Sequence, residues 1–276
     1  MKKFLNYLLA GALVAVTVSF TAGAAVAATA KAQTSPVLTR IAESGTLKVG
    51  MSGGQPPFNM KTRTGDIIGM EVDLAGLLAA SLGVDLEIVE LPFSDLLDAL
   101  DQGKVDLVMS GMTATLRRNM NAAFVGPYYI TGKTILARSE TIARLQSQQL
   151  GEADVTITAL KGSTSEDFVK AVAPGATLKA TATYDQAIDL LLADKADAFV
   201  ADASIVILSM MRWPDAGLVA ADKALTIEPI GIAVSPSDPL LLNLVQNYVE
   251  ALKATGVLEE LRKAWFENPD WIPQIP

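Results

Sequence analysis

The amino-acid sequence predicts an α/β protein with two lobes and a ligand cleft between them. Short apolar runs between glycines, such as residues 105–109, are typical of buried strands in a parallel sheet. One helix–turn–strand pattern occurs twice along the chain, which predicts two similar α/β units. Two extended stretches, at 129–134 and 227–232, connect these units, and paired connections of this kind form a hinge.

The repeated pattern brings two different strand ends together. Its matching positions lie 91 residues apart: Leu97-Asp98 and Ile188-Asp189, Lys104 and Lys195, and Asp106 and Asp197. Gly111 follows the first strand, and Asp202 takes the same position in the second copy. In open α/β sheets, ligands bind outside the carboxyl ends of the strands. A ligand that carries both a carboxylate and an ammonium would therefore fit between the two ends.

The first strand end offers groups that suit a carboxylate. Gly111 lacks a Cβ, so the backbone can approach a ligand closely. Thr113 and Thr115 supply hydroxyl and N–H groups, while Arg117 and Arg118 supply planar forks that match a carboxylate. A polar turn with solvated arginines is the alternative interpretation, and these residues alone leave both open.

The start of the chain has the pattern of a secretory signal peptide. Lys2 and Lys3 precede an apolar segment that runs to Phe20, and small residues follow. We expect cleavage after Ala27, with Ala32 as the second choice, and therefore a secreted protein. A membrane anchor is the alternative, although the apolar segment is near the lower length limit for a bilayer span. The lack of cysteine excludes a lipoprotein anchor.

Hydrophobic periodicity and turn residues give the order of the elements. We expect strands or extended segments at 47–51, 86–91, 105–109, 124–129, 130–138, 155–159, 196–201 and 225–234. We expect helices at 39–43, 95–100, 166–172, 185–193, 203–212, 239–255 and 257–266, and one whose buried stripe is Val72, Ala75, Leu78, Ala79 and Leu82. The Gly126-Pro127 turn should break the regularity of its extended segment, and Pro92-Phe93-Ser94 should cap the helix that starts at Asp95.

These elements predict four segments of chain. After the signal peptide at 1–27 come a leader and first short helix at 28–45. Lobe 1 should comprise 46–130 plus 230–276, because the C-terminal helices return to it, and lobe 2 should comprise 131–229.

Composition narrows the classes of function. The chain has 276 residues, 50% of them hydrophobic, with no cysteine and no histidine. The lack of histidine removes Ser-His-Asp and Cys-His nucleophile systems, histidine zinc sites and the usual general base near neutral pH. We expect no cofactor and no metal, although catalysis by carboxylates alone stays open. A formal net charge of −8 gives no electrostatic footprint for nucleic acid.

Three aromatic or loop features have alternative interpretations. Phe58, after the turn-rich segment 52–57, is expected in the core. Phe93 lies between a strand end and a helix start, where it could seal the core or stack on a ligand. The glycine and hydroxyls of 161–165 precede a helix, where they could form an anion site or an ordinary N-cap.

The chain resembles the bacterial extracellular solute-binding proteins of family 3, the periplasmic amino-acid receptors of ABC importers. The segment 69–74 looks like the family signature, with Met70 at a position where other bulky residues are usual. The more specific match is 111–118, followed by Phe124 and Pro127-Tyr128 at the family spacing. This resemblance implies the type II periplasmic-binding-protein fold, in which two α/β lobes joined by a two-strand hinge close around a ligand.

The resemblance also implies roles for individual residues. Arg118 would form a bidentate pair with the α-carboxylate of an amino acid, and the N–H groups of Thr113 and Thr164 would complete that site. Asp202, the Thr113 hydroxyl and the Gly111 carbonyl would bind the α-ammonium. The positions of the side-chain pocket are Phe93 as an aromatic wall, Gln55 where many members have a second wall, and Ser52 where receptors for basic amino acids have an aspartate.

The function expected from this resemblance is a receptor that delivers a free amino acid to the membrane subunits of an ABC permease, working as a monomer without nucleic-acid partners. A neutral or polar amino acid is favoured because Ser52 carries no charge; an acidic one stays open because Lys161 could reach the cleft. The alternatives are a periplasmic cyclohexadienyl or arogenate dehydratase-like enzyme on the same fold, and an amino-acid sensor that docks a receptor.

Overall fold

The computed structural model of the protein describes residues 35–147, 154–221 and 223–276. The predicted signal peptide, 1–27, and the predicted leader before residue 35 lie outside the described residues. The chain after residue 33 belongs to one compact unit.

The predicted elements occur in the predicted order. The strands are β1 (Thr46–Met51), β2 (Gly54–Gln55), β3 (Asn59–Lys61), β4 (Ile67–Ile68), β5 (Asp85–Glu90), β6 (Leu107–Val108), β7 (Ala123–Thr131), β8 (Lys133–Arg138), β9 (Thr156–Leu160), β10 (Thr177–Thr181), β11 (Ala198–Asp202), β12 (Leu218–Ala220) and β13 (Glu228–Val234). The α-helices are α1 (Pro36–Ser44), α2 (Met70–Leu82), α3 (Leu96–Asp101), α4 (Ser139–Ser147), α5 (Thr164–Val172), α6 (Tyr184–Leu192), α7 (Ala203–Arg212), α8 (Pro239–Ala254) and α9 (Val257–Arg262). The structure adds elements that the sequence did not predict, among them β10, β12 and α4.

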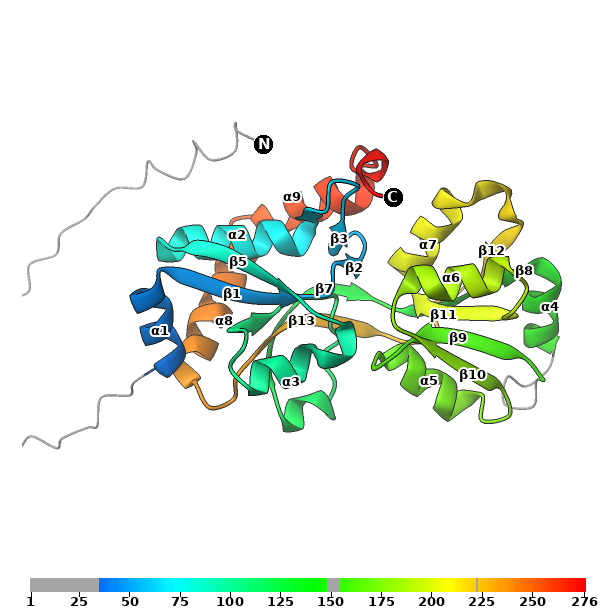
Figure 1. Ribbon diagram of the computed structural model, residues 1–276, viewed down its shortest axis with the longest axis horizontal. Coiled ribbons are helices and arrows are strands. Elements are labelled where there is room, and N and C mark those ends of the chain that lie inside the picture. Colours follow the sequence, from blue (N-terminus) through cyan, green and yellow to red (C-terminus); the bar gives the residue numbers. More distant parts are fainter. Residues whose placement is uncertain (1–34, 148–153, 222) are drawn as a thin grey trace, which may run out of the picture. The chain divides into compact units, whose positions relative to one another are not determined.

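Two sheets with the same plan organise the described residues (Figure 1). The first sheet has the strand order β5-β1-β6-β13-β7, in which β1 is parallel to β5 and β6, while β13 is antiparallel to β6 and β7. The second sheet has the order β10-β9-β11-β8-β12, with β9 parallel to β10 and β11, and β8 antiparallel to β11 and β12. Each sheet thus has three neighbouring parallel strands, then one strand of opposite direction, then a last strand that again runs in the direction of the first three. A small third sheet, β2-β3-β4, joins the first unit.

The sequence repeat corresponds to a repeated hydrogen-bond pattern. The Lys48 N–H donates to Asp106 Oδ2 at 2.8 Å, and the Asp106 N–H donates back to the Lys48 carbonyl at 2.8 Å. In the second sheet, the Thr156 N–H donates to Asp197 Oδ2 at 2.7 Å, and the Asp197 N–H donates to the Thr156 carbonyl at 2.8 Å. Each aspartate therefore joins the start of one strand to its parallel neighbour by two hydrogen bonds. The same arrangement in both sheets confirms the prediction of two similar units.

Two chain crossings connect the sheets. One is the passage from β7 to β8 through Gly132, and the other enters β13 at Glu228. Glu228 pairs with Thr131 in register, so the crossings lie side by side. The sequence predicted both crossings at these positions.

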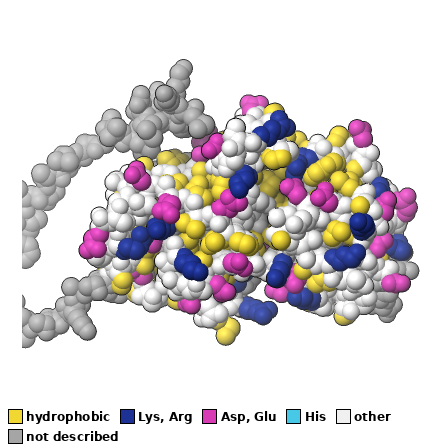
Figure 2. All heavy atoms as spheres, viewed as in Figure 1, with side chains coloured by type: hydrophobic (Ala, Val, Ile, Leu, Met, Phe, Trp, Pro, Cys, Tyr) yellow, Lys and Arg dark blue, Asp and Glu magenta, His cyan; other side chains and the backbone are white. Residues whose placement is uncertain are grey.

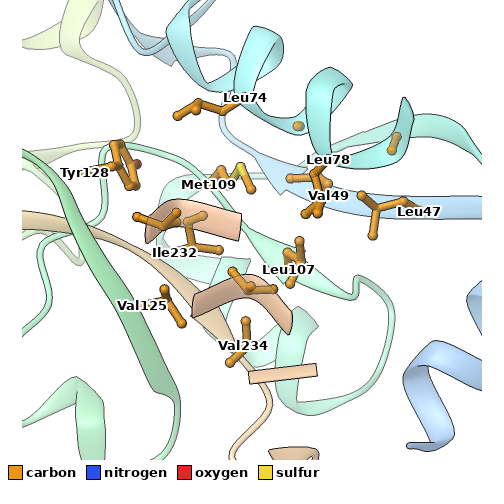
Figure 3. Close-up of a cluster of buried hydrophobic side chains, with 14 of the residues drawn as sticks. Leu47, Val49, Leu74, Leu78, Leu107, Met109, Val125, Tyr128, Ile232 and Val234 are labelled. Carbon is orange, nitrogen blue, oxygen red and sulfur yellow. The ribbon is translucent and has the colours of Figure 1, made fainter. Parts of the chain in front are cut away.

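The first sheet packs against α2 and α8 through a buried apolar cluster (Figure 3). Leu47 and Val49 of β1 and Leu107 of β6 have no exposed surface, and Leu74 and Leu78 of α2 cover them. Burial of side chains of this size stabilises by about 1.5–3 kcal/mol each. Phe58 belongs to this cluster and is 1% exposed, with Tyr129 and Phe266 edge-on to its ring, as predicted for a core residue.

The details of the predicted elements were confirmed only in part. β7 continues through Gly126-Pro127, where a register shift between Ile230 and Ile232 of β13 confirms the predicted break in regularity, but other details differ. In α2 the buried stripe includes Glu71, whereas Val72 and Leu82 are only half-buried.

Helix ends also differ from the prediction. In the described residues, α3 starts after a 3-10 turn, η1 (Phe93–Asp95), and the Asp95 side chain caps no N–H group of that helix. Its carboxylate accepts a hydrogen bond from the Ser94 hydroxyl. The first helix begins at Pro36, because Ser35 caps it from further upstream than expected. The last predicted helix ends at Arg262 and continues as a π-helix, Lys263–Glu267.

Candidate binding site at the junction of the two sheets

Arg118 connects the two sheet systems. It begins a 3-10 turn, η2 (Arg118–Met120), where its N–H donates to Thr115 Oγ1 at 3.1 Å. The guanidinium donates to the carbonyl of Thr113 at 2.9 Å and to the carbonyl of Gly162 at 3.0 Å. Thr113 follows β6 of the first sheet, and Gly162 follows β9 of the second. The arginine that the sequence singled out is therefore held between the two strand ends.

Phe93 contributes to the core and also faces this arginine. Its side chain is 6% exposed within an apolar cluster, and the Arg118 guanidinium carbon lies 5.7 Å from the centre of its ring. Both interpretations of Phe93 thus describe part of its surroundings. Gly162 lies nearby, and its φ of +75° favours glycine. A Cβ on Gly162 would lie 3.1 Å from Ser94, so the loop after β9 approaches η1 closely.

Hydroxyl groups surround Glu228. The sequence did not predict this residue as part of the site. Thr164 Oγ1 donates to Glu228 Oε2 at 3.0 Å, and Thr226 Oγ1 donates to Oε1 at 2.7 Å. Thr113 Oγ1 lies 3.5 Å from Thr164 Oγ1 across the junction. The signal that could have identified Glu228 is an acidic residue inside an otherwise apolar crossing, 227–232.

Asp202 lies at the end of β11 and already has a cationic partner. Lys133, opposite it in β8, places Nζ 3.1 Å from Asp202 Oδ1 and 3.4 Å from Glu228 Oε1. The Lys133 side chain is 1% exposed. Sequence reasoning missed this lysine too, although it is the charged residue of the other crossing. Asp202 and Glu228 thus form a buried pair of carboxylates with one ammonium between them.

Burial and hydrogen bonds shift the protonation of these groups in different directions. Burial raises the pKa of Asp202, and the Lys133 ammonium only partly offsets it. Burial also disfavours ionised Glu228, but Lys133 and the hydrogen bonds from threonines outweigh it, so the pKa of Glu228 lies below its usual value. Burial lowers the pKa of Arg118, against the attraction of Asp167, Glu228 and Asp202.

Tyr184 and Gln55 extend the site. Tyr184 begins α6, is 7% exposed, and its hydroxyl is hydrogen-bonded to the Gln55 side chain from β2. Burial raises the pKa of Tyr184 well above its usual value, and the charge of Asp202 adds to this rise. Gln55 is itself only 2% exposed. Tyr184 carried no sequence signal, because the first position of a helix is an ordinary place for tyrosine.

Gly111 is held by a buried polar network behind the site. Its N–H donates to Glu71 Oε1 at 2.7 Å, and its φ of +57° lies in the left-handed region that favours glycine. A Cβ there would lie 3.2 Å from Gln55 Oε1, so the two positions are neighbours. Ser52 is connected to the same region, since its hydroxyl accepts a hydrogen bond from Ser110 at 3.1 Å.

The structure brings most of the candidate residues to one junction. Arg118, Thr113, Thr164, Asp202 and Phe93 are linked by the contacts above, and Gln55 reaches them through Tyr184. Two basic side chains lie outside the junction: Arg117 is 85% exposed, as the interpretation of a solvated arginine predicts, and Lys161 is exposed too.

Three further features bear on function. In the described residues, no group of three or more acidic, cysteine or histidine side chains is placed to hold a metal ion. No helix in the same residues is long and apolar enough to cross a bilayer. Acidic and basic side chains are interspersed on the face shown in Figure 2.

Comparisons with known proteins agree with this arrangement. Cyclohexadienyl dehydratase of Pseudomonas aeruginosa is 28% identical, with 83% of this chain and 86% of the relative covered. ABC transporter arginine-binding protein 1 of Escherichia coli is 26% identical, over 80% of this chain and 90% of the relative. A crystal structure of a putative ABC-transporter binding component from Wolinella succinogenes, complexed with lysine, superimposes with a TM-score of 0.78 at 33% identity and covers 83% of this chain and 99% of its own.

The profile of the bacterial extracellular solute-binding proteins, family 3, matches residues 47–268. This match spans both sheets and every site residue described above. The chain therefore belongs to the bacterial extracellular solute-binding proteins of family 3 and has their two-lobed type II fold.

Proposed function

We propose that this protein is a periplasmic receptor that clamps a free amino acid between its lobes and delivers it to an ABC permease. The observation that carries the proposal is that the Arg118 guanidinium lies near the buried carboxylates Asp202 and Glu228, whose charges oppose the lowering of its pKa by burial. A guanidinium suits a ligand carboxylate, and a carboxylate pair suits an ammonium.

The clamp uses groups from both lobes. Lobe 1 (46–130 and 230–276) supplies Arg118 and Thr113, whereas lobe 2 (131–229) supplies Thr164 and Asp202. Closure removes water from the charged pairs, which strengthens them and penalises any charge that lacks a partner. The Thr113 and Thr164 hydroxyls, 3.5 Å apart, mark where the two lobes meet.

A thermal-shift screen against all twenty amino acids tests the receptor function. A ligand present at a hundred times its dissociation constant stabilises the folded protein by about 2.7 kcal/mol, which gives a clear rise in melting temperature. We expect at least one amino acid to do so at sub-millimolar concentration. A screen in which none does would overturn the proposal.

Delivery and export have separate tests. Cells that lack the gene should lose high-affinity uptake of the identified amino acid; unchanged uptake would contradict delivery to a permease. N-terminal sequencing of the secreted protein should find a start after Ala27 or Ala32.

A dehydratase is the second candidate, favoured by the cyclohexadienyl dehydratase relative and by a buried carboxyl group, Asp202, whose pKa burial raises. Such a group could donate a proton to the ring hydroxyl, which leaves as water while the ring carboxylate leaves as CO2. Incubation with prephenate or arogenate separates the two functions, because an enzyme forms the aromatic product faster than buffer alone does. We expect no product above the rate in buffer.

A further inference from the structure

Lys133 is a buried cation that a clamp for an amino acid does not itself require. Its side chain is 1% exposed, and Nζ lies 3.1 Å from Asp202 Oδ1 and 3.4 Å from Glu228 Oε1. The backbone holds this position firmly: the Lys133 N–H donates to Thr226 Oγ1 at 3.1 Å, and its carbonyl accepts from the Leu225 N–H at 2.7 Å. The ammonium is therefore built into the junction, between the two crossings.

The charged groups at the junction balance. In their ionised forms, Arg118 and Lys133 carry two positive charges, while Asp202 and Glu228 carry two negative ones. The nearby Asp167 is 58% exposed and lies 3.9 Å from the solvated Arg117, so solvent screens this pair. In a site closed to water, each unpaired charge is costly. The net charge of the buried groups and the ligand together therefore determines how favourable closure is.

Lys133 leaves one negative charge for the ligand. Without it, the two carboxylates would present two negative charges to the ammonium side of the ligand. With it, a single ammonium completes the balance there, while Arg118 takes the ligand carboxylate. A ligand of zero net charge then leaves the closed site neutral.

We propose that Lys133 is a specificity-determining residue that selects ligands of zero net charge, that is, zwitterionic amino acids with uncharged side chains. This inference rests on the receptor function proposed above. The relatives named for arginine and the structure complexed with lysine involve ligands of net charge +1, so family membership alone predicts no such preference.

Matched ligands and variants test the inference by calorimetry. Citrulline and arginine are near-isosteric but differ by one positive charge, and glutamine and glutamate differ by one negative charge. The wild type should bind citrulline at least tenfold more tightly than arginine, about 1.4 kcal/mol. Lys133→Met should shift the arginine-to-citrulline affinity ratio at least tenfold towards arginine, whereas Lys133→Arg, which keeps the charge, should leave the ratio unchanged.

Glu228→Gln gives the opposite test and does not depend on a folded Lys133→Met protein. It leaves the buried groups with one excess positive charge, so the glutamate-to-glutamine ratio should rise at least tenfold. The double variant Lys133→Met/Glu228→Gln restores neutrality and should restore the wild-type ratios. Circular dichroism checks that each variant is folded.

The outcomes separate the two proposals. One outcome is that the wild type binds amino acids while the affinity ratios change less than tenfold in Glu228→Gln and, where they fold, in Lys133→Met and the double variant. In that case the charge inference is wrong and the receptor function stands. If the wild type binds none of the twenty amino acids and does not bind citrulline, the receptor function is wrong, and the inference that rests on it is wrong too.

Discussion

Glu71 and Gly111 connect the core of the first sheet to the binding site. The Gly111 N–H donates to Glu71 Oε1 at 2.7 Å, from a carboxyl group with no exposed surface. Tyr128 donates to the same oxygen, and Asn59 Nδ2 donates to Oε2 at 2.5 Å. This network positions the strand end from which the proposed ligand contacts begin.

The first prediction concerns the pH dependence of stability. Burial raises the pKa of Glu71 from 4.5 to about 7, although its three hydrogen bonds oppose the shift. Between these values the unfolded chain loses the proton while the folded protein keeps it, so Glu71 lowers stability as pH rises through this window. The full effect, reached above pH 7, is about 3 kcal/mol.

Urea unfolding of Glu71→Gln at pH 5 and pH 8 measures this effect. The unfolding free energy of the variant relative to wild type should increase by about 2.5 kcal/mol from pH 5 to pH 8, because glutamine does not titrate and a small part of the effect is already present at pH 5. The control Glu43→Gln, at an exposed position of α1, should follow the wild type. A constant difference between Glu71→Gln and wild type would contradict the prediction.

The second prediction concerns the two ends of the clamp. Arg118→Ala and Asp202→Ala should each weaken binding of the identified amino acid by about 2–5 kcal/mol, because each leaves a buried ligand charge without its partner. The control is Arg117→Ala, whose side chain is 85% exposed and should change the affinity little. Calorimetry on folded variants measures this, and a loss of similar size in Arg117→Ala would reassign the ligand arginine.

The third prediction concerns Phe93. Since its side chain is 6% exposed, Phe93→Ala should cost about 3–5 kcal/mol of stability. Phe93→Leu keeps most of the apolar volume but removes the ring beside Arg118, so it should lose affinity with little loss of stability. Unfolding and binding measured on both variants separate the roles. Full affinity in Phe93→Leu would show that Phe93 acts only in the core.

The fourth prediction concerns the repeated aspartates. Asp106 and Asp197 make the same backbone contacts, but their side chains are 4% and 42% exposed. Asp106→Ala should therefore cost about 1–3 kcal/mol of stability, and Asp197→Ala less, because water replaces the lost acceptor. Asp98→Ala, at an exposed position of α3, is the control. Equal losses at 106 and 197 would contradict the burial argument.

Sequence reasoning predicted the features that local pattern determines. Apolar runs gave the strands, and the offset between Asp106 and Asp197 gave the two units, because both aspartates cap the same point of the same local motif. Asn59, Glu71, Tyr128 and Lys133 could not be found this way. They are polar or charged residues whose burial depends on partners distant in the chain, and periodicity carries no information on such partners.

The same reason explains the incomplete prediction of the site. The motif 111–118 marked Arg118, but Asp202 was expected to be available to a ligand ammonium alone. Lys133 already donates to it, at 3.1 Å, because the antiparallel register of β8 and β11 places the two residues opposite each other. Register between strands that lie 69 residues apart in sequence is a property of the tertiary fold.

Calorimetric titration with the identified amino acid, its deaminated acid and its decarboxylated amine tests the proposed clamp most directly. In the proposed clamp Arg118 binds the ligand carboxylate and the Asp202–Glu228 pair binds the ammonium, so each fragment satisfies one of the two and leaves the other without its partner. Binding of the amino acid alone, with neither fragment bound at sub-millimolar concentration, is the result we predict. Sub-millimolar binding of either fragment would contradict a clamp that requires both charges.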